Sequence, residues 1–368
     1  MRVASFNVEN LFERATALDQ PSWKSGRRAL ELHASVNALL NKTIYSEPDK
    51  KAIIKALTDL GLGKADDGGK FAVLRQNRGH LLKRSNGTMQ IVANGRKDWL
   101  GWVDLKTREV NELATQHTAM VIRDVNPDIL AVIEMESRPA LKHFSEVLLP
   151  KVNSTPFAHV MLIDGNDDRG IDVGIATRPG FAISGMQSHV DDTDADGQIF
   201  SRDCPEYMLT TPNGGSLALL VNHLKSKGFG HQDDSDRRRE RQAKRVAAIY
   251  NRLKTQQPHI IVLGDFNDTP DSGPLRALLK DTDLADISQH AKFSSDGRPG
   301  TFKNGTKSEK LDYILLSPAL QARVTGGGVF RKGVWGGKNG TLFEHYKTIK
   351  REVNAASDHA AIFVDLDL

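Results

Sequence analysis

Seven short apolar runs, each four to eight residues long, divide the chain, and most of them end on polar side chains. Runs of this length with consecutive apolar residues are typical of strands that are buried on both faces of a sheet. We therefore predict central strands at 2–6, 128–133, 172–177, 217–224, 259–266, 311–317 and 360–366.

Helical patterns lie between some of these strands. Residues 115–125 form one such pattern, and Asn126-Pro127 provides a stop signal directly after it. A second helix is predicted over about 236–253, capped by its first residue, and a third is expected to begin at the proline of 274–280. Strands mixed with irregularly spaced helices predict an α/β fold, as a sandwich rather than a regular barrel.

Residues 13–112 differ from the rest and are predicted to be an insertion between the first strand and the first helix. The first half, about 27–60, is helical in pattern. The second half alternates apolar and polar residues around Asn86-Gly87, which is a strong hairpin signal. We expect residues 1–368 to form a single catalytic domain, with the insertion packed on the rest of that domain. A basic, glycine-rich loop is predicted as a second insertion at 326–352.

Composition excludes a membrane-spanning protein. Charged residues make up 26% of the 368 residues, and no apolar run approaches the ~18 residues needed to cross a bilayer. Cys204 is the only cysteine, so no internal disulfide can form. The first twelve residues lack the long apolar region of a signal peptide. We therefore expect a cytoplasmic enzyme without a membrane partner, or a secreted one only if a leader precedes this sequence.

Polar residues suited to metal and phosphate chemistry stand at the ends of the predicted strands. Such side chains gather at strand ends because the sheet holds them rigidly while the adjoining loops stay open. Carboxylate and carboxamide oxygens without a cysteine cluster favour a hard divalent cation, Mg²⁺ or Mn²⁺, over zinc. The residues are Asn7, Glu134, Asn222, His223, Asp265, Asn267, Asp312, Asp358 and His359.

The order of these motifs resembles the endonuclease/exonuclease/phosphatase superfamily, which includes exonuclease III-like and DNase I-like nucleases. The matching pieces are FNVENL (6–11), DILAVIE (128–134), NHLKS (222–226), GDFND (264–268), TF (301–302) with LDYILLS (311–317), and SDH (357–359). The resemblance implies a DNase I-like, four-layer α/β sandwich with its site at one edge of two packed sheets.

The resemblance also implies a role for each matching residue. Asn7 and Glu134 would hold the metal ion, with Asp358 near a second or alternative metal position. Glu136 departs from the family pattern, and it either supports the site or caps the turn that follows it. Phosphate or substrate contacts are implied for Arg202, Asn222, Lys225 and Ser226. Lys332 is a further candidate for substrate contact, because its basic, glycine-rich loop shortly precedes Asp358-His359.

The implied catalytic histidine is His359, which Asp312 would orient. Asp265 and Asn267 would position the attacking water and a phosphoryl oxygen, and His223 would contact the phosphate or assist the leaving oxygen. Phosphodiester hydrolysis needs these parts, because water must lose a proton and charge builds on the phosphoryl oxygens. An imidazole paired with a carboxylate can take that proton.

Charge favours a nucleic-acid substrate. The net charge is +4, and residues 64–108 carry ten basic and four acidic residues. The same segment holds Trp99 and Trp102, which either stack on a nucleic-acid strand or form the small core of the insertion. We expect a metal-dependent nuclease, with DNA favoured over RNA. The alternative is the same chemistry on a small or lipid phosphoester, as in a sphingomyelinase or an inositol phosphatase.

An acidic stretch at 192–203 has the spacing of a calcium loop. Asp192, Asp194 and Asp196 alternate, and Gly197 follows them. No helical pattern flanks the stretch, which excludes an EF-hand. Two interpretations remain, an accessory Ca²⁺ or Mg²⁺ site and a connecting loop whose Asp and Gly residues form turns.

Overall fold

The computed structural model describes residues 1–18, 23–85, 87–167, 169–227 and 232–368, and these form two compact units. The main unit contains residues 1–12 and nearly all of the chain from residue 110 onward. The insertion unit contains residues 13–109, close to the range expected for the insertion.

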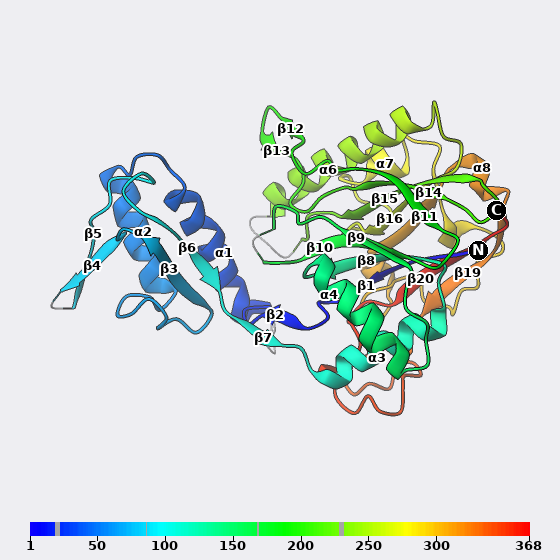
Figure 1. Cartoon of the computed structure of the whole chain (residues 1–368), viewed down its shortest axis with the longest axis horizontal. Coiled ribbons are helices and arrows are strands. Elements are labelled where there is room, and N and C mark those ends of the chain that lie inside the picture. The colour runs from blue at the N-terminus through cyan, green and yellow to red at the C-terminus, as the bar shows by residue number, and fades with distance from the viewer. Residues whose placement is uncertain (19–22, 86, 168, 228–231) are drawn as a thin grey trace. The chain divides into compact units, whose positions relative to one another are not determined.

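Two six-stranded mixed sheets form the centre of the main unit (Figure 1). The first has the order β19-β20-β1-β8-β10-β9, and the second has the order β11-β14-β15-β16-β18-β17. The first sheet comprises β1 (Arg2–Asn7), β8 (Ile129–Met135), β9 (His159–Leu162), β10 (Asp172–Thr177), β19 (Val324–Phe330) and β20 (Ala361–Leu366). The second comprises β11 (Ala182–Gln187), β14 (Glu206–Thr210), β15 (Ser216–His223), β16 (Ile260–Asp265), β17 (Ala285–Asp286) and β18 (Asp312–Leu316).

All seven predicted strands are present, and they occupy the inner positions of the sheets. Strands that the sequence did not predict are mostly at the edges, namely β9, β11, β17 and β19, together with β14 beside one edge. Edge strands are paired on one side only, so they lack the long apolar runs that mark a buried strand.

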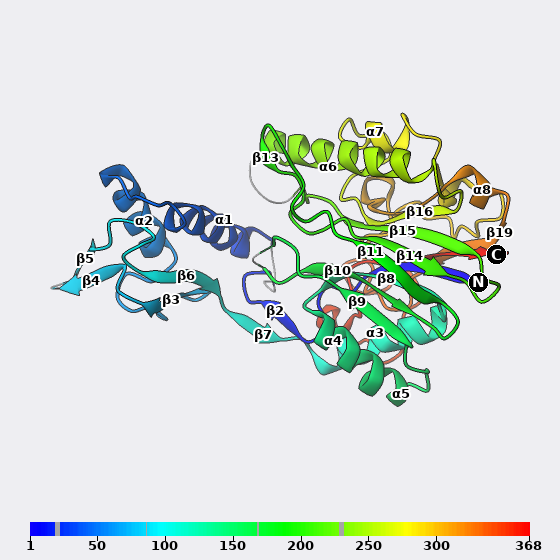
Figure 2. The ribbon, with the colours of Figure 1, turned by 45° about the horizontal axis from the view of Figure 1, so that its top comes forward.

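Helices cover the outer face of each sheet, which completes four layers (Figure 2). Leu130 and Val132 of β8 pack outward against α3 (Glu112–Val125), whereas Leu220 of β15 and Val262 of β16 pack outward against α6 (Gln232–Leu253). Shorter helical segments are α4 (Arg138–His143), η1 (Phe144–Leu148), α5 (Leu149–Lys151), α7 (Arg276–Leu279), η2 (Ile287–Gln289), η3 (Lys307–Glu309), α8 (Pro318–Gln321) and η4 (Glu352–Asn354). The predicted α/β sandwich is confirmed.

Three predicted boundaries are wrong. Helix α6 begins at Gln232 rather than Asp236, because Asp236 accepts a hydrogen bond from Gln232 and pairs with Arg239 inside the first turns. The helix expected over 274–280 is shorter and covers only α7. The first part of the predicted 326–352 loop is strand β19, which pairs with β20. A Cβ on Gly327 would lie 2.9 Å from the Phe363 carbonyl oxygen, so glycine permits this close pairing.

The insertion unit has a hydrophobic core of its own. Helices α1 (Trp23–Leu40) and α2 (Glu47–Asp59) pack together, and α1 also packs on β6. A capping box between Ser46 and Asp49 fixes the start of α2. Strand β3 (Ala72–Arg78) pairs with β6 (Leu100–Leu105), β4 (Leu82–Ser85) pairs with β5 (Thr88–Ile91), and β2 (Glu13–Ala15) pairs with β7 (Thr107–Glu109). The hairpin predicted at Asn86-Gly87 joins β4 to β5, although Asn86 itself lies outside the described residues.

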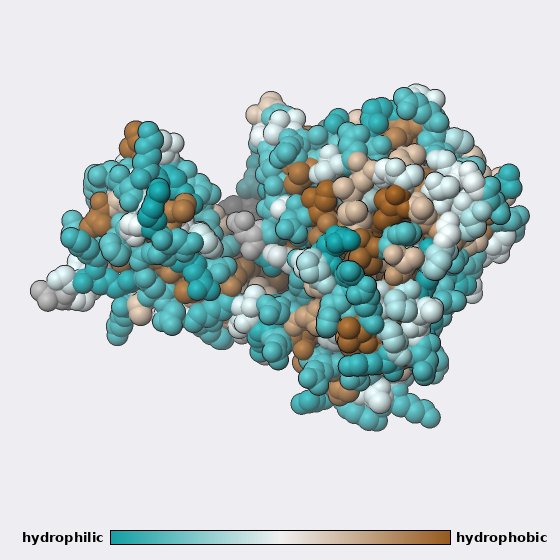
Figure 3. Space-filling view, in the orientation of Figure 1, coloured by the Kyte–Doolittle hydropathy of each residue, from teal (hydrophilic) through white to brown (hydrophobic). Residues whose placement is uncertain are grey.

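Hydrophilic residues dominate the visible surface, and apolar residues occur there in small groups (Figure 3). In the part of the chain that the structure describes, none of the helices is both long enough and apolar enough to cross a membrane.

Candidate active site

Four polar residues continue the rows of side chains that fill the space between the two sheets. Successive side chains of a strand point to opposite faces, so every second residue faces the inner core. The inward rows contain Val3 on β1, Val221 on β15, Leu263 on β16 and Ile314 on β18. The same rows end in Asn7, His223, Asp265 and Asp312.

The pairing of the strands brings these row ends together. His223 is the register partner of Asp265, and Asp265 is the register partner of Asp312. Gly264 allows β15 and β16 to pair here, because a Cβ at this position would lie 1.9 Å from the Asn222 carbonyl oxygen. The candidate site is therefore at one end of the sandwich, where the carboxyl ends of β1, β15 and β16 meet the start of β18.

His359 and Asp312 form a buried pair at this end. Nδ1 of His359 lies 2.8 Å from Oδ2 of Asp312, a hydrogen-bond distance. The hydroxyl of Ser357 accepts a hydrogen bond from the His359 backbone N–H and donates one to the Asn7 carbonyl oxygen. Burial disfavours the imidazolium, but Asp312, followed by Asp265, outweighs burial and holds the pKa of His359 well above its ordinary value.

Asp265 stands at the centre of the site. Its carboxylate accepts hydrogen bonds from the backbone and side-chain N–H groups of Asn267 and from Nδ2 of Asn7 at 3.3 Å. Nε2 of His359 lies 3.9 Å from the same carboxylate. Burial, followed by the nearby charge of Asp312, raises the pKa of Asp265 to about 7.

Glu134 reaches the site through an unusual backbone conformation. Ile133 faces the inner core, so regular alternation would turn Glu134 outward. Instead Glu134 has a φ of 63°, a left-handed value that is uncommon for a non-glycine residue. Its Oε1 lies 3.6 Å from Nε2 of His223. The turned backbone therefore brings Glu134 next to the inward-facing row.

His223 is neutral in this environment. Burial, followed by the charges of Arg202 and Arg169, holds the pKa of His223 well below its ordinary value. Nη2 of Arg202 lies 3.3 Å from Nε2 of His223, and arginine can only donate, so Nε2 is the accepting nitrogen. The proton of the neutral ring is then on Nδ1, and the approaches of Glu134 and Asp265 to His223 are not ion pairs.

A cationic corner adjoins His223. Arg202 is 2% exposed and lies 3.1 Å from Asp167, which also binds Arg169. Nη1 of Arg202 has no hydrogen-bond partner among the described residues. Burial, followed by Arg169 and Arg202, lowers the pKa of Lys225 to about 7. Arg202, Arg169 and Lys225 thus place cationic side chains together beside Asp167, and such groups can bind an anion such as phosphate.

The acidic side of the site fits a divalent cation. One ligand atom from each of Asp265, Asp312 and His359 lies within 4.8 Å of the others. Burial, followed by Glu9, raises the pKa of Asp358 to about 7, and Glu134 contributes to the same shift. Crowded carboxylates with raised pKa values, beside carboxamide oxygens, are the donors that a hard cation stabilises.

Two of the predicted phosphate ligands have other partners. Asn222 is fully buried on the opposite face of β15 from His223, beside Leu220, and its Nδ2 donates to the Leu220 carbonyl oxygen. The strand alternation that brings His223 inward thus turns Asn222 toward α6. Lys332 forms an ion pair with Glu344 at 3.0 Å. The orientation of Asn222 contradicts its assignment as a phosphate ligand, whereas the assignment of Lys332 stays a prediction.

Glu136 has a structural role. Its Oε1 accepts the backbone N–H groups of Leu11 at 2.8 Å and Phe12 at 2.6 Å, which fixes the segment after β1. Ser226 lies beside Lys225 in the motif, and its hydroxyl has no hydrogen-bond partner among the described residues.

The acidic stretch at 192–203 does not gather its carboxylates around a common point. Asp192 accepts from Arg245 at 2.6 Å and from His189, and Asp194 forms an ion pair with Arg241. Strands β12 (Thr193–Asp194) and β13 (Gly197–Gln198) form a short hairpin. Since arginines of α6 occupy two of the three carboxylates, the geometry favours the turn-forming loop over an accessory metal site.

Sequence inspection missed Asp167, Arg169 and Glu9. Asp167 and Arg169 belong to the segment between β9 and β10, where no strand end marked them. In the sequence they appear only as charged residues near a glycine. Such a combination is common in loops and does not by itself indicate a site. Oε2 of Glu9 accepts the backbone N–H of Asp358 at 3.2 Å, a contact across 349 positions that no local pattern predicts.

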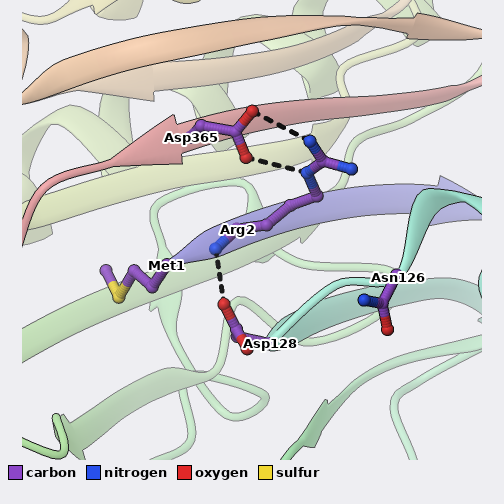
Figure 4. A pocket seen from close by; sticks show the side chains of 5 residues that line it. All are labelled: Met1, Arg2, Asn126, Asp128 and Asp365. Atoms are coloured by element: carbon purple, nitrogen blue, oxygen red, sulfur yellow. Dashed lines mark hydrogen bonds and ion pairs between the residues drawn. The ribbon is translucent and has the colours of Figure 1, made fainter.

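A pocket at the other end of β1 is distinct from this site (Figure 4). Its lining is Met1, Arg2, Asn126, Asp128 and Asp365. Arg2 binds Asp365 through two nitrogens, at 2.7 and 2.9 Å, and its backbone N–H donates to Asp128 at 2.7 Å. The charged groups satisfy one another and tie β1 to its neighbours.

Comparison with solved structures finds similar folds at low sequence identity. A mannosyl-6-phosphatase from Bacteroides thetaiotaomicron is 18% identical with a TM-score of 0.49, over 70% of this chain and 92% of that one. The human Nocturnin catalytic domain is 16% identical with a TM-score of 0.48, over 70% and 87%. Sphingomyelinase C from Streptomyces griseocarneus is 15% identical with a TM-score of 0.46, over 68% and 92%. No curated protein matches the sequence.

The family assignment comes from a match to a family model. The model of the Endonuclease/Exonuclease/phosphatase family matches residues 108–359, which include Glu134, His223, Asp265, Asp312 and His359. This range covers well over half of the chain and confirms the resemblance seen in the motifs. The chain belongs to the endonuclease/exonuclease/phosphatase family of phosphoester hydrolases.

Proposed function

We propose that the protein is a divalent-metal-dependent phosphodiesterase that hydrolyses nucleic acid, with DNA as its preferred polymer. The main evidence for hydrolysis is the buried pair of His359 and Asp312, in which Nδ1 lies 2.8 Å from Oδ2, beside Asp265. A bound divalent cation would oppose the carboxylates that raise the pKa of His359 and would favour the neutral ring. In that neutral form, a histidine with one ring nitrogen held by a carboxylate keeps the other nitrogen, Nε2, for a proton from water.

Each residue of the site has a task in this proposal. Asp312 fixes the ring of His359 and stabilises the imidazolium that forms when Nε2 takes the proton. Asp265, held by the N–H groups of Asn267, orients the attacking water. Arg202, whose Nη1 has no hydrogen-bond partner among the described residues, can donate to a phosphoryl oxygen as its charge grows. His223 holds Arg202 in place by accepting from its Nη2.

The metal ligands proposed here are Asn7, Glu134 and Asp358, with Mg²⁺ or Mn²⁺ as the ion. A divalent cation, when bound, offsets the charge that develops on the phosphoryl oxygens. The carboxamide oxygen of Asn7 and the carboxylates of Glu134 and Asp358 suit such a hard ion. Asp265, Asp312 and His359 are also close enough together to hold an ion. Asp312 is left out of the proposed set because its Oδ2 lies at hydrogen-bond distance from Nδ1 of His359.

The charge of the insertion unit supports a nucleic-acid substrate. Residues 13–109 contain 18 basic and 11 acidic residues, whereas the other residues contain 32 basic and 35 acidic ones. The insertion thus carries a net charge of +7 on a chain whose total is +4. A concentrated positive charge attracts a polyanion over many phosphates, which a small ester does not require.

The second candidate is hydrolysis of a small or lipid phosphoester. The cationic corner of Arg202, Arg169 and Lys225 favours this candidate, because a single phosphate group could fill it. A lipid substrate would require the protein to reach a membrane surface.

One assay separates the two candidates. Supercoiled plasmid, linear duplex, single-stranded DNA, RNA and bis-p-nitrophenyl phosphate are incubated with Mg²⁺, Mn²⁺ or EDTA. We expect metal-dependent cleavage of DNA that is lost in His359→Ala and retained in His159→Ala, a control at an exposed position on β9. Cleavage of the small ester without any polymer would favour the second candidate. No cleavage of any substrate would contradict both.

A further inference from the structure

The two tryptophans of the insertion unit have different environments. Trp99 is fully buried, and its Nε1 donates to the Tyr45 hydroxyl at 2.8 Å, which in turn donates to the Leu40 carbonyl oxygen. Trp102 is 40% exposed. Its indole has no hydrogen bond or ring contact in the part of the chain that the structure describes. Packing therefore explains Trp99, whereas a large part of the Trp102 ring stays open to solvent.

Trp102 lies on the outer face of the two-stranded ribbon formed by β3 and β6. The inner face is buried in the core of the unit through Leu74, Val103 and Leu105. On the outer face, Leu100 is 43% exposed and follows the same row as Trp102. A row of two exposed apolar side chains on a ribbon is a surface that a flat ligand can cover.

Arginines face these apolar residues across the ribbon. Arg75 is the register partner of Trp102, and Arg78 is the register partner of Leu100. Both arginines are exposed. Arg75 also pairs with Asp104 at 3.2 Å, but both side chains are about half exposed, so this pair is weak and can open. The outer face thus combines an aromatic ring, an aliphatic side chain, two cations and the carboxylate of Asp104.

The occupant that fits this combination is a single strand of nucleic acid. Unpaired bases stack on an exposed aromatic ring, and the phosphates between them bind neighbouring arginines. In a duplex the bases are stacked on each other and cannot reach a ring on a protein surface. The net charge of +7 on the unit complements a polyanion and opposes a basic partner.

We propose that the outer face of the β3–β6 ribbon binds single-stranded nucleic acid, with a base stacked on Trp102 and phosphates on Arg75 and Arg78. The site belongs to the insertion unit and needs neither a metal ion nor hydrolysis. This inference rests on the proposed function only for the choice of nucleic acid as the ligand. It extends that function because it gives the insertion unit a role in holding the substrate.

The test measures binding by the full-length protein in EDTA, where no metal-dependent cleavage can occur. Fluorescence anisotropy follows a fluorescein-labelled oligothymidylate of about 20 nucleotides, long enough to cover one such site. We expect Trp102→Ala to raise the Kd roughly tenfold and Trp102→Phe to keep most of the affinity, because stacking requires only a ring. Replacing Arg75 and Arg78 with alanine should lower the slope of log Kd against log salt by about 1.4.

Two variants of the same unit serve as matched controls. Ile44→Ala removes an apolar side chain that is 75% exposed, and Lys51→Ala removes an exposed cation from α2. Neither belongs to the β3–β6 ribbon, so both should bind the strand as the parent does. Circular dichroism melting curves establish that Trp102→Ala is folded.

Several outcomes would overturn the proposal. The first is that Trp102→Ala and Ile44→Ala bind the oligothymidylate with equal affinity. The second is that the parent protein binds duplex DNA more tightly than the single strand, and the third is that it binds neither. Self-association of the protein that disappears in Trp102→Ala, seen by sedimentation without strand binding, would assign the face to a second copy instead. Hydrolysis of bis-p-nitrophenyl phosphate by the same variants is measured in parallel, so a failure of the proposed activity is distinguishable from a failure of this site.

Discussion

His359 and Asp312 are 47 positions apart in the sequence, yet Nδ1 of His359 lies 2.8 Å from Oδ2 of Asp312 in the interior of the protein. Asp312 begins strand β18, and His359 lies two residues before β20, which belongs to the other sheet. The pair therefore depends on the packing of the two sheets.

Replacing Asp312 with asparagine should lower both activity and the pKa of His359. The carboxylate of Asp312 is the main group that raises the pKa of this histidine. Without it, we expect the pKa of metal-free His359 to fall toward its ordinary value and phosphodiesterase activity to fall by about 10²- to 10⁴-fold. NMR titration of the ring protons in EDTA measures the pKa. Asp283→Asn, at an exposed carboxylate that binds Tyr250, is the control and should change neither quantity.

Glu134 and Glu136 should separate metal binding from stability. We expect Glu134→Gln to weaken Mn²⁺ binding by about tenfold or more and to leave the melting temperature nearly unchanged. Glu136→Gln should retain metal affinity, but its weaker hydrogen bonds to Leu11 and Phe12 should lower the free energy of unfolding by about 1–2 kcal/mol. Isothermal titration calorimetry and urea unfolding measure the two effects. Equal metal affinities in the two variants would contradict the proposed role of Glu134.

Asp172 should make stability depend on pH. Burial raises the pKa of this carboxyl to about 7, and Asp164 and Asp167 add to the shift. The folded protein thus keeps a proton that the unfolded chain loses near pH 4, so stability should fall as pH rises from about 4 to 7. Asp172→Asn cannot ionise, and we expect it to be more stable than the parent at pH 7.5, by on the order of 2–4 kcal/mol.

Urea unfolding of both proteins at pH 4 and pH 7.5 tests this difference. The asparagine can still accept the Gly165 backbone N–H, which donates to Asp172 at 2.7 Å. The stabilising effect should therefore be present at pH 7.5 and nearly absent at pH 4. A variant that is equally destabilised at both pH values would show that Asp172 is ionised in the folded protein.

The acidic stretch at 192–203 should not bind calcium. Arg241 pairs with Asp194, and Arg245 pairs with Asp192, so two of the three candidate ligands already have a cation. We expect the calcium titration curves of Asp194→Ala and the parent protein to be identical. A saturable calcium-induced rise in melting temperature that Asp194→Ala abolishes would restore the metal site.

The candidate site was predictable to the extent that its residues follow buried strands. Asp265 and Asp312 could be found because apolar runs locate the strands, and the strand ends locate the polar groups. Asn222 and His223 are adjacent at the end of one strand, so their side chains point to opposite faces of the sheet. Asn222 was wrongly assigned because the sequence does not show which of these faces packs against the second sheet. Asp167 and Arg169 were missed because they are on a loop without any periodic pattern.

The sequence by itself determined the inner strands, the α/β class and the family, because buried strands require apolar runs and the motifs recur in a fixed order. Only the tertiary structure decided which polar residues meet. The packing of two sheets joins His359 to Asp312, and the left-handed backbone at Glu134 turns that side chain toward His223. Contacts between residues far apart in the chain depend on sheet order and register, which local patterns do not encode.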